Sequence, residues 1–362
     1  MTAVSTKTYR LSGGSAGCTD LTADGFGARV EGQWFAPKIS RKAMKQLMRR
    51  SDRVALRHFG LWLGLLVVSG VTAFLTWGTL WCIPAFAVYG ILIAASDYRA
   101  HELSHGTPFK TRWLNEALYH LNAFMTLHKG FYWRWSHSRH HTDTIIVGRD
   151  PEIAVPRPPD ILGIVLDLLF LKSGSREIGK IVRHAFGSLN ADGHHFVPES
   201  EQWKVVWSSR AYVAIFAGTI AACFAIGSIL PAMFIVLPRF YGGPLSQIFN
   251  ITQHAGLAED VLDHRLNTRT VGMNPVFRFL YINMNYHIEH HMFPMVPFYA
   301  LPQLHELIKD QCPPAYPSVL AAYRAIIPAL LRQRREPGWH VVRQLPSGAM
   351  PFRPEPALAA AA

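Results

Sequence analysis

The chain has few of the residues that build several common kinds of protein. Only 17% of its 362 residues are charged, and only 4 are cysteines. The cysteines stand far apart, so neither a disulfide framework nor a thiolate metal site is expected; they are Cys18, Cys82, Cys223 and Cys312. The scarcity of charge, combined with 49% hydrophobic residues, is typical of a membrane protein.

The sequence also lacks the motifs that hold redox cofactors. No G-x-G-x-x-G follows a predicted strand, no cysteine cluster suits an iron–sulfur centre, and no fused haem domain is recognisable. Any redox reaction of this chain would therefore need electrons from a separate protein.

Charge is missing altogether from Gly60 to Ser96, a stretch long enough for two helices of about 20 residues that cross a bilayer. A second apolar block begins near Ala211. We expect an all-α protein with four transmembrane helices near residues 60–77, 79–96, 211–230 and 231–250. Pro238 and Arg239 fall inside the fourth, which should be kinked there with Arg239 facing protein or water; a re-entrant hairpin is the alternative.

The distribution of cations predicts the orientation in the membrane. A run of lysines and arginines from Lys38 to Arg57 precedes the first helix, and many more lie between the second and third. The short turns on the other side of the membrane lack lysine and arginine. The N-terminal side is therefore expected in the cytoplasm, together with a helical cap that carries the histidine boxes described below. The net charge of +12 then suits anionic headgroups and acidic redox partners, and no nucleic-acid partner is expected.

The distribution of apolar and polar residues divides the chain into three predicted parts. Residues 1–37, rich in glycine, serine and threonine, are expected to be a flexible segment, and residues 336–362 a loosely held tail. Residues 38–335 form the membrane domain. Within it, the apolar run from Ile161 to Leu171 is too short to span and should lie at the interface.

Histidine is the residue that the chain has in excess, with 18 in all. The pattern H-x-x-H-H occurs twice, although about 0.04 occurrences are expected by chance at this composition. We call three clusters the first, second and third box; they are His101 and His105, then His137, His140 and His141, then His287, His290 and His291. On a helix, spacings of three and four put side chains on one face, close enough to share metal ions.

Eight imidazoles are too many for one ion, so the boxes indicate two metals. Imidazole suits zinc, copper, iron and nickel alike, which leaves the element open. In the second and third boxes, the two adjacent histidines diverge enough to serve different metals. His254 is a ninth candidate, and Asn250, one helical turn before it at the end of the fourth predicted span, could hold a water on one metal.

The boxes HELSH at 101–105, HSRHH at 137–141 and HIEHH at 287–291, in this order and with four predicted spans, resemble the membrane fatty acid desaturase family. The resemblance covers roughly residues 55–310. The third box and its surroundings also look like bacterial relatives of the rhizopine oxygenase and dihydrorhizobitoxine desaturase types. Carotenoid hydroxylases and ketolases have similar boxes.

The resemblance implies two non-haem iron ions, O₂ as co-substrate and an external electron donor, a ferredoxin or cytochrome with its reductase. It implies a water-mediated contact from Asn250 and these iron ligands: His101, His105, His137, His140, His141, His254, His287, His290 and His291. Glu102 and Glu289 are expected to fix imidazole tautomers. The other nine histidines, His128 and His264 among them, are expected to be structural.

The function expected first is therefore O₂-dependent desaturation of a membrane lipid acyl chain by a multi-pass protein, with its active site on the cytoplasmic side of a membrane, such as the bacterial inner membrane. One alternative keeps the di-iron centre and changes the substrate, to a small polar metabolite or a carotenoid-type molecule. Another is a non-catalytic membrane protein that binds metal. The oligomeric state is left open.

Overall fold

The computed structural model describes residues 33–350, so Cys18 and most of the predicted N-terminal segment lie outside the described range. Within that range every regular element is a helix, apart from two isolated β-bridges. The α-helices are α1 (Arg41–Leu47), α2 (Asp52–Leu75), α3 (Cys82–Ala94), α4 (Ser96–Ser104), α5 (Arg112–Met125), α6 (Gly130–Thr142), α7 (Ile161–Leu166), α8 (Leu171–Ala185), α9 (Ala191–Phe196), α10 (Glu199–Ala225), α11 (Leu230–Ile235), α12 (Pro238–Tyr241), α13 (Gly243–His254), α14 (His264–Asn267), α15 (Pro275–Leu280), α16 (His287–Met292), α17 (Leu301–Ile308) and α18 (Val319–Gln333). The 3₁₀ helices are η1 (Asp167–Leu169), η2 (Phe298–Ala300) and η3 (Lys309–Gln311).

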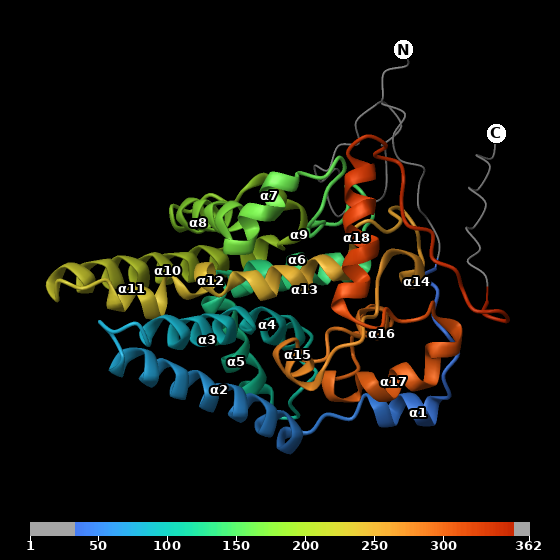
Figure 1. Ribbon diagram of the computed structural model, residues 1–362, viewed down its shortest axis with the longest axis horizontal. Coiled ribbons are helices and arrows are strands. Elements are labelled where there is room, and N and C mark those ends of the chain that lie inside the picture. Colours follow the sequence, from blue (N-terminus) through green and yellow to red (C-terminus); the bar gives the residue numbers. More distant parts are fainter. Residues whose placement is uncertain (1–32, 351–362) are drawn as a thin grey trace, which may run out of the picture.

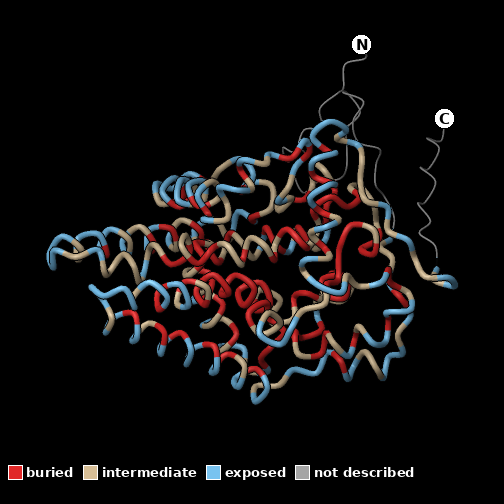
Figure 2. Tube along the Cα trace, viewed as in Figure 1, coloured by how far each residue is buried: buried red, intermediate tan, exposed pale blue. Residues whose placement is uncertain are grey.

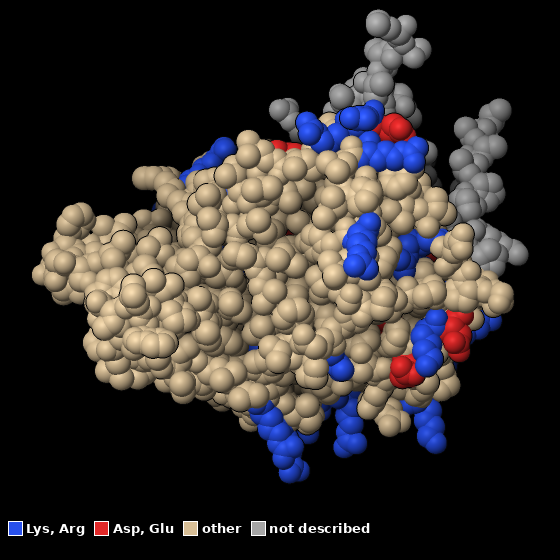
Figure 3. Space-filling view, viewed as in Figure 1, with Lys and Arg blue, Asp and Glu red and all other residues tan. Residues whose placement is uncertain are grey.

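The molecule has an apolar end made of two helical hairpins. In Figure 1, α2 and α3 form one hairpin and α10 and α11 the other, and both protrude toward the same side. Their outer side chains are large and apolar: Val68 is 64% exposed and Leu75 is 74% exposed. On the face shown in Figure 3, this end carries no lysine, arginine, aspartate or glutamate. An exposed apolar surface of this extent is typical of a membrane or protein contact.

Two stretches, Arg41–Leu75 and Glu199–Ala225, are long and apolar enough to cross a membrane. They overlap the first and third predicted spans, although the stretches end at Leu75 and Ala225, before the predicted ends at 77 and 230, and α10 begins well before residue 211. The second and fourth predicted spans differ from single long helices. Of residues 79–96, only Cys82–Ala94 form α3, which is continued by α4 after Ala95. Residues 231–250 are divided among α11, α12 and α13.

Proline and glycine account for the divided return limb. Pro238 begins α12, because a proline ring fits the first turn of a helix and interrupts one elsewhere. Gly242 lies against the backbone of Gly90, so a side chain there would overlap the Gly90 carbonyl oxygen. The limb thus packs closely on α3 and bends where the sequence predicts a kink.

Arg239, in the bend, faces protein. Its guanidinium group is 3.0 Å from the carboxylate of Asp97 at the start of α4, and it lies over the ring of Phe170. The second oxygen of Asp97 is 2.8 Å from Nε2 of His128. The buried ion pair of Asp97 with Arg239 joins the two halves of the helical array.

The rest of the chain wraps the inner ends of these helices. Figure 2 shows buried residues concentrated on the inner helices and exposed residues at the protruding ends. One large apolar core, which includes Trp62, Leu103, Phe249 and Ile288, extends from α2 through α4 and α13 to α16. Buried apolar surface of this kind stabilises by about 25 cal/mol per Å². Trp133 of α6 packs against the same core, which therefore contacts all four helices that carry the histidines.

Two segments predicted to be loosely held contact the rest of the protein. The ring of Trp34 stacks on His264 at 4.1 Å, and the N–H of Val341 donates to the carbonyl of Gly256 at 2.9 Å. Residues 351–362 of the predicted tail lie outside the described range. The predicted interfacial run at 161–171 forms α7, η1 and the start of α8, and Leu162 is 69% exposed there.

Replacing Asp97 by asparagine is expected to destabilise the fold, because Arg239 would keep a buried charge without a counter-charge. The cost of breaking a buried pair in this way is about 3–5 kcal/mol, measurable as a lower thermal unfolding midpoint of the purified protein at neutral pH.

Glu306→Gln is the matched control, because it removes one carboxylate from an exposed pair with Lys309. Its unfolding midpoint should equal that of the unchanged protein. An Asp97→Asn protein as stable as this control would show that the Asp97–Arg239 pair does not hold the fold together.

Candidate metal centre

The three boxes and His254 reach one place from four helices. The first box ends α4, the second occupies the last turns of α6, the third fills α16, and His254 is the last residue of α13. All nine side chains that the sequence singled out meet inside the protein. Of these, His290 is 0% exposed and His287 is 1% exposed.

Their nitrogens form two groups. In each group, one nitrogen per residue lies within 4.8 Å of those of all the other members. The first group is His101, His105, His137, His141 and His290, and the second is His140, His254 and His291. His287 adjoins the second group, with its Nε2 atom 3.2 Å from Nε2 of His291. Adjacent histidines of the second and third boxes thus face different groups, as the helical spacing predicts.

The distances between ring nitrogens suit a shared ion. Metal–nitrogen bonds of about 2.0–2.1 Å, at angles between 90° and 109°, separate two ligand nitrogens by about 2.9–3.4 Å. The Nε2 atoms of His137 and His141 are 3.1 Å apart. The Nε2 atoms of His101 and His290, which come from different helices, are 2.7 Å apart, slightly closer than this range.

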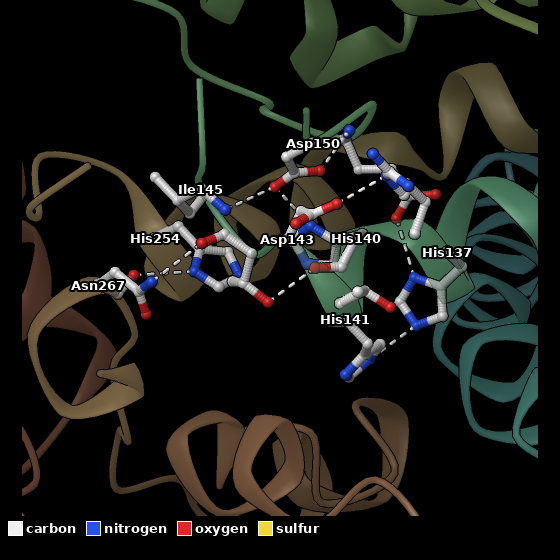
Figure 4. Close-up of polar contacts among 12 residues, drawn as sticks. His137, His140, His141, Asp143, Ile145, Asp150, His254 and Asn267 are labelled. Atoms are coloured by element: carbon white, nitrogen blue, oxygen red, sulfur yellow. Dashed lines mark hydrogen bonds and ion pairs between the residues drawn. The ribbon is translucent and has the colours of Figure 1, made fainter. Parts of the chain in front are cut away.

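Oxygen acceptors orient four of the imidazoles from behind. Nδ1 of His137 is 2.9 Å from Glu152, Nδ1 of His140 is 2.8 Å from Asp150, and Nδ1 of His254 is 2.9 Å from the carbonyl of Asn267. Figure 4 shows Asp150 beside His140 and Asn267 beside His254. A carbonyl or carboxylate oxygen only accepts, so these Nδ1 atoms carry the proton and Nε2 keeps its lone pair.

The fourth oriented imidazole is that of His291, whose Nδ1 atom is 3.1 Å from the hydroxyl of Thr144. The same hydroxyl donates to the carbonyl of His140 at 2.8 Å. Since that proton is used, the hydroxyl oxygen accepts from Nδ1 of His291. Nε2 of His291 is therefore also left as the metal-facing lone pair.

Buried ring nitrogens without partners provide a direct test of fit. Nε2 of His105, in the first group, and Nε2 of His254, in the second, are buried and form no hydrogen bond. Leaving a buried polar atom unsatisfied costs about 1–3 kcal/mol, and metal ions that accept imidazole ligands would remove this cost in both groups. The donor set therefore fits two metal ions.

Most of the imidazoles are neutral, which is the state that binds metal. Burial first, and then the neighbouring imidazoles, lower the pKa of His101, His105, His141, His254, His287, His290 and His291 well below the ordinary value. Burial also lowers the pKa of His140, but Asp150 outweighs it, and the net shift is upward. A carboxylate at this position makes the imidazole a stronger ligand.

The two glutamates within the boxes have other partners than expected. Glu102 accepts from the hydroxyl of Thr107 at 2.6 Å and from the N–H of Phe298 at 3.0 Å, and burial raises its pKa to about 7. Glu289 binds Nδ1 of His305 at 2.5 Å and accepts from the hydroxyl of Thr270 at 2.6 Å. The prediction that they orient box imidazoles is wrong, because i±1 neighbours on a helix point to different faces.

A cavity adjoins the histidines. His101, His137, His140 and His254 form one side, and Asn250 lies among them. The rest of the cavity wall consists of aliphatic and polar side chains. The polar ones are Glu152, Arg157, Gln253 and Glu259, and Arg157 pairs with Glu259 at 3.2 Å.

Comparison with known proteins agrees with this arrangement. The model of the family described as "Fatty acid desaturase" matches residues 85–323. Similar curated proteins are "Delta(12) fatty acid desaturase FAD2" of Calendula officinalis, 24% identical over 66% of this chain and 67% of that protein, and "Delta(6)-fatty-acid desaturase fat-3" of Caenorhabditis elegans, 23% identical over 64% and 59%. "Fatty acid desaturase 2-like protein FADS2B" of Mus musculus is 22% identical over 71% and 57%.

The chain thus spans between 57% and 67% of the length of these three relatives. The matched region contains all nine histidines and both groups of converging nitrogens. This chain, an all-helical protein with a buried histidine cluster able to bind metal, belongs to the fatty acid desaturase family.

Proposed function

We propose that the histidine cluster binds two iron ions and that the chain is an O₂-dependent desaturase of lipid acyl chains. The observation that carries the proposal is the convergence of eight imidazoles in two groups, each with a buried and unpartnered nitrogen, with His287 as a ninth beside the second group. The first ion would be held by the five histidines of the first group. The second would be held by His140, His254, His287 and His291, with Asn250 reaching it through a water. Membership of the desaturase family favours iron over the other metals that imidazole accepts.

The iron pair, when bound, supplies with O₂ an oxidant strong enough to take hydrogen from an unactivated alkyl carbon. The overall reaction removes two hydrogens from adjacent CH₂ groups and consumes one O₂, two protons and two electrons, leaving a double bond and two waters. The protein's part is to orient the imidazoles through Glu152, Asp150 and the Asn267 carbonyl and to keep bulk water from the buried centre.

The apolar end of the molecule supports a lipid substrate and a membrane location. We propose four crossings, by α2, by α3 with the start of α4, by α10, and by the divided limb α11–α13, within a membrane domain of residues 38–335. The histidines would then lie on the cytoplasmic side, in line with the cations that precede α2. A bacterial inner membrane would suit this topology. A ferredoxin or cytochrome with its reductase would deliver electrons at that basic face.

A second candidate has an observation of its own. The cavity beside the histidines is lined by an ion pair, two amides and a further carboxylate as well as by aliphatic side chains. Such a lining suits a small polar molecule better than a bare acyl chain, because buried polar groups need partners. Oxidation of a small polar metabolite, as in the rhizopine or dihydrorhizobitoxine types, is therefore the alternative.

Changing His140 to alanine is expected to lower the iron content of the purified protein and to abolish turnover, since one ion would lose a ligand. Iron per chain is measured by elemental analysis and turnover by O₂ consumption with reductant. His194→Ala, at an exposed position, is the matched control and should keep both. Full activity in the His140 variant would remove this residue from the metal centre.

Asp150→Asn is expected to weaken iron binding by roughly 10–100-fold, because the carboxylate that strengthens His140 as a ligand would be replaced by a neutral amide. A competition titration with a chelator measures the change. Glu116→Gln, which alters a half-exposed pair with Arg134, should bind iron as tightly as the unchanged chain. Equal affinity in all three proteins would show that Asp150 does not act on the centre.

Lipid analysis separates the two candidate substrates. Expressing the chain in a host with simple lipids should give unsaturated acyl chains that are missing from a host carrying the His140→Ala variant. If the lipids of both hosts are identical while purified protein with a reductant consumes O₂ only when a polar metabolite is added, the acyl-chain assignment fails and the alternative stands.

A further inference from the structure

Arg269 is a buried cation that forms no ion pair with the described residues, and the ring of Tyr316 is the aromatic group nearest to its guanidinium. Its side chain is 1% exposed, and Nε, Nη1 and Nη2 all lack a hydrogen-bond partner. Its backbone N–H donates to the carbonyl of Gln253 at 2.9 Å, which fixes the residue close to the metal centre. A buried guanidinium is costly unless it is paired, so three empty donors on one buried group require an explanation.

The other buried arginines of the described range have oxygen partners for their guanidinium groups. Arg99 donates to the carbonyls of Ala95 and Leu280, Arg157 pairs with Glu259, Arg239 pairs with Asp97, and Arg265 pairs with Asp263. Each of the four has an oxygen partner from the chain itself. Within residues 33–350, Arg269 is the buried arginine for which no such oxygen is in place.

A second arginine increases the local excess of positive charge. The guanidinium groups of Arg269 and Arg343 lie 5.8 Å and 4.8 Å from the centre of the same ring, that of Tyr316. Arg343 donates from Nη2 to the carbonyl of Pro314 at 3.1 Å, but its Nε is buried and unpartnered. Burial first lowers the pKa of Arg269, to about 10, and repulsion from Arg343 adds to the shift while Tyr316 opposes it. In the part of the chain that the structure describes, neither guanidinium forms an ion pair.

We propose that Arg269, Arg343 and Tyr316 form a binding site for an oxyanion, a phosphate or carboxylate group. Planar guanidinium groups bind these anions through paired N–H donors, and a tyrosine hydroxyl can add a further donor. One oxyanion would satisfy the empty nitrogens of both arginines and separate their charges. The source is either a lipid headgroup or a small soluble anion. The site does not depend on the proposed desaturase reaction.

Gly256 and the C-terminal segment enclose the position next to Arg269 where the oxyanion would bind. Gly256, at φ +78°, lies beside it, and a Cβ on Gly256 would be 3.7 Å from Nη2 of Arg269 and 3.0 Å from Ala329 on α18. The N–H of Val341 donates to the Gly256 carbonyl at 2.9 Å, so the segment that carries Arg343 closes over this position. Gly256 also lines the cavity beside the histidines. An anion here would connect the C-terminal segment to the wall of that cavity.

The test is thermal unfolding of the purified full-length chain, titrated with inorganic phosphate or acetate against chloride at equal ionic strength. The midpoint should rise saturably with phosphate or acetate, and at 100 times the dissociation constant the folded-to-unfolded ratio should increase about 100-fold. Arg269→Met should remove this response. Arg343→Gln should weaken binding by roughly tenfold or more, the loss of one charge-assisted hydrogen bond.

Arg324→Gln is the matched control, because it removes one positive charge from an exposed position on α18; its response should be unchanged. In a parallel arm, the protein is placed in nanodiscs of phosphatidylcholine with or without phosphatidate. A shift with the soluble anions assigns a soluble ligand, and a shift only with phosphatidate assigns a lipid headgroup. Both results support the site.

The proposal is overturned if neither arm shifts the midpoint of the unchanged chain. In that case Arg269→Met should be more stable than the unchanged chain in every buffer, because it removes an unpaired buried charge. If Arg269→Met does not fold, the response of the unchanged chain and its weakening in Arg343→Gln decide the question. An undiminished response in Arg343→Gln would likewise contradict the site.

Discussion

Nine imidazoles at one buried position impose the constraint on which the rest of this structure depends. Each ring must be oriented and neutral, and its free nitrogen must lie close to the nitrogens of rings from other helices. Burying so many polar atoms is unfavourable unless they have partners. Acceptors from outside the box helices, namely Glu152, Asp150 and the Asn267 carbonyl, satisfy some of these polar atoms. Two metal ions would satisfy the remainder at the nitrogens that have no protein partner.

The apolar end and the buried centre are parts of one architecture. The protruding ends of the hairpins α2–α3 and α10–α11 expose large aliphatic side chains and show no charge on the face in Figure 3, whereas the cations lie toward the end that holds the histidines. The helices that form the apolar end continue into the centre, since α3 is followed by α4 and the return limb ends at His254. The ion pair of Asp97 with Arg239 joins these two continuations just outside the centre.

Local patterns in the sequence predict the parts of this structure that depend on local geometry. Spacings of three and four residues identify the histidines and even their division, because adjacent rings on a helix point to different faces. Pro238 likewise predicts the bend in the return limb. The groups that orient the imidazoles come from outside the box helices and leave no local pattern in the sequence. Glu152 lies 15 residues beyond His137 in a loop, and Asn267 acts through a backbone carbonyl that any residue would provide. The unpartnered state of Arg269 depends on packing from four separate segments, so it appears only in three dimensions.

The central claim, that the cluster holds two irons through imidazole nitrogens, is tested most directly by elemental analysis and iron X-ray absorption on the purified protein. The account predicts two irons per chain with a coordination shell dominated by histidine nitrogen and an iron–iron contribution at fixed distance. A preparation that is fully folded and active with O₂ yet holds a single ion per chain, or irons coordinated chiefly by carboxylate oxygen, would contradict it.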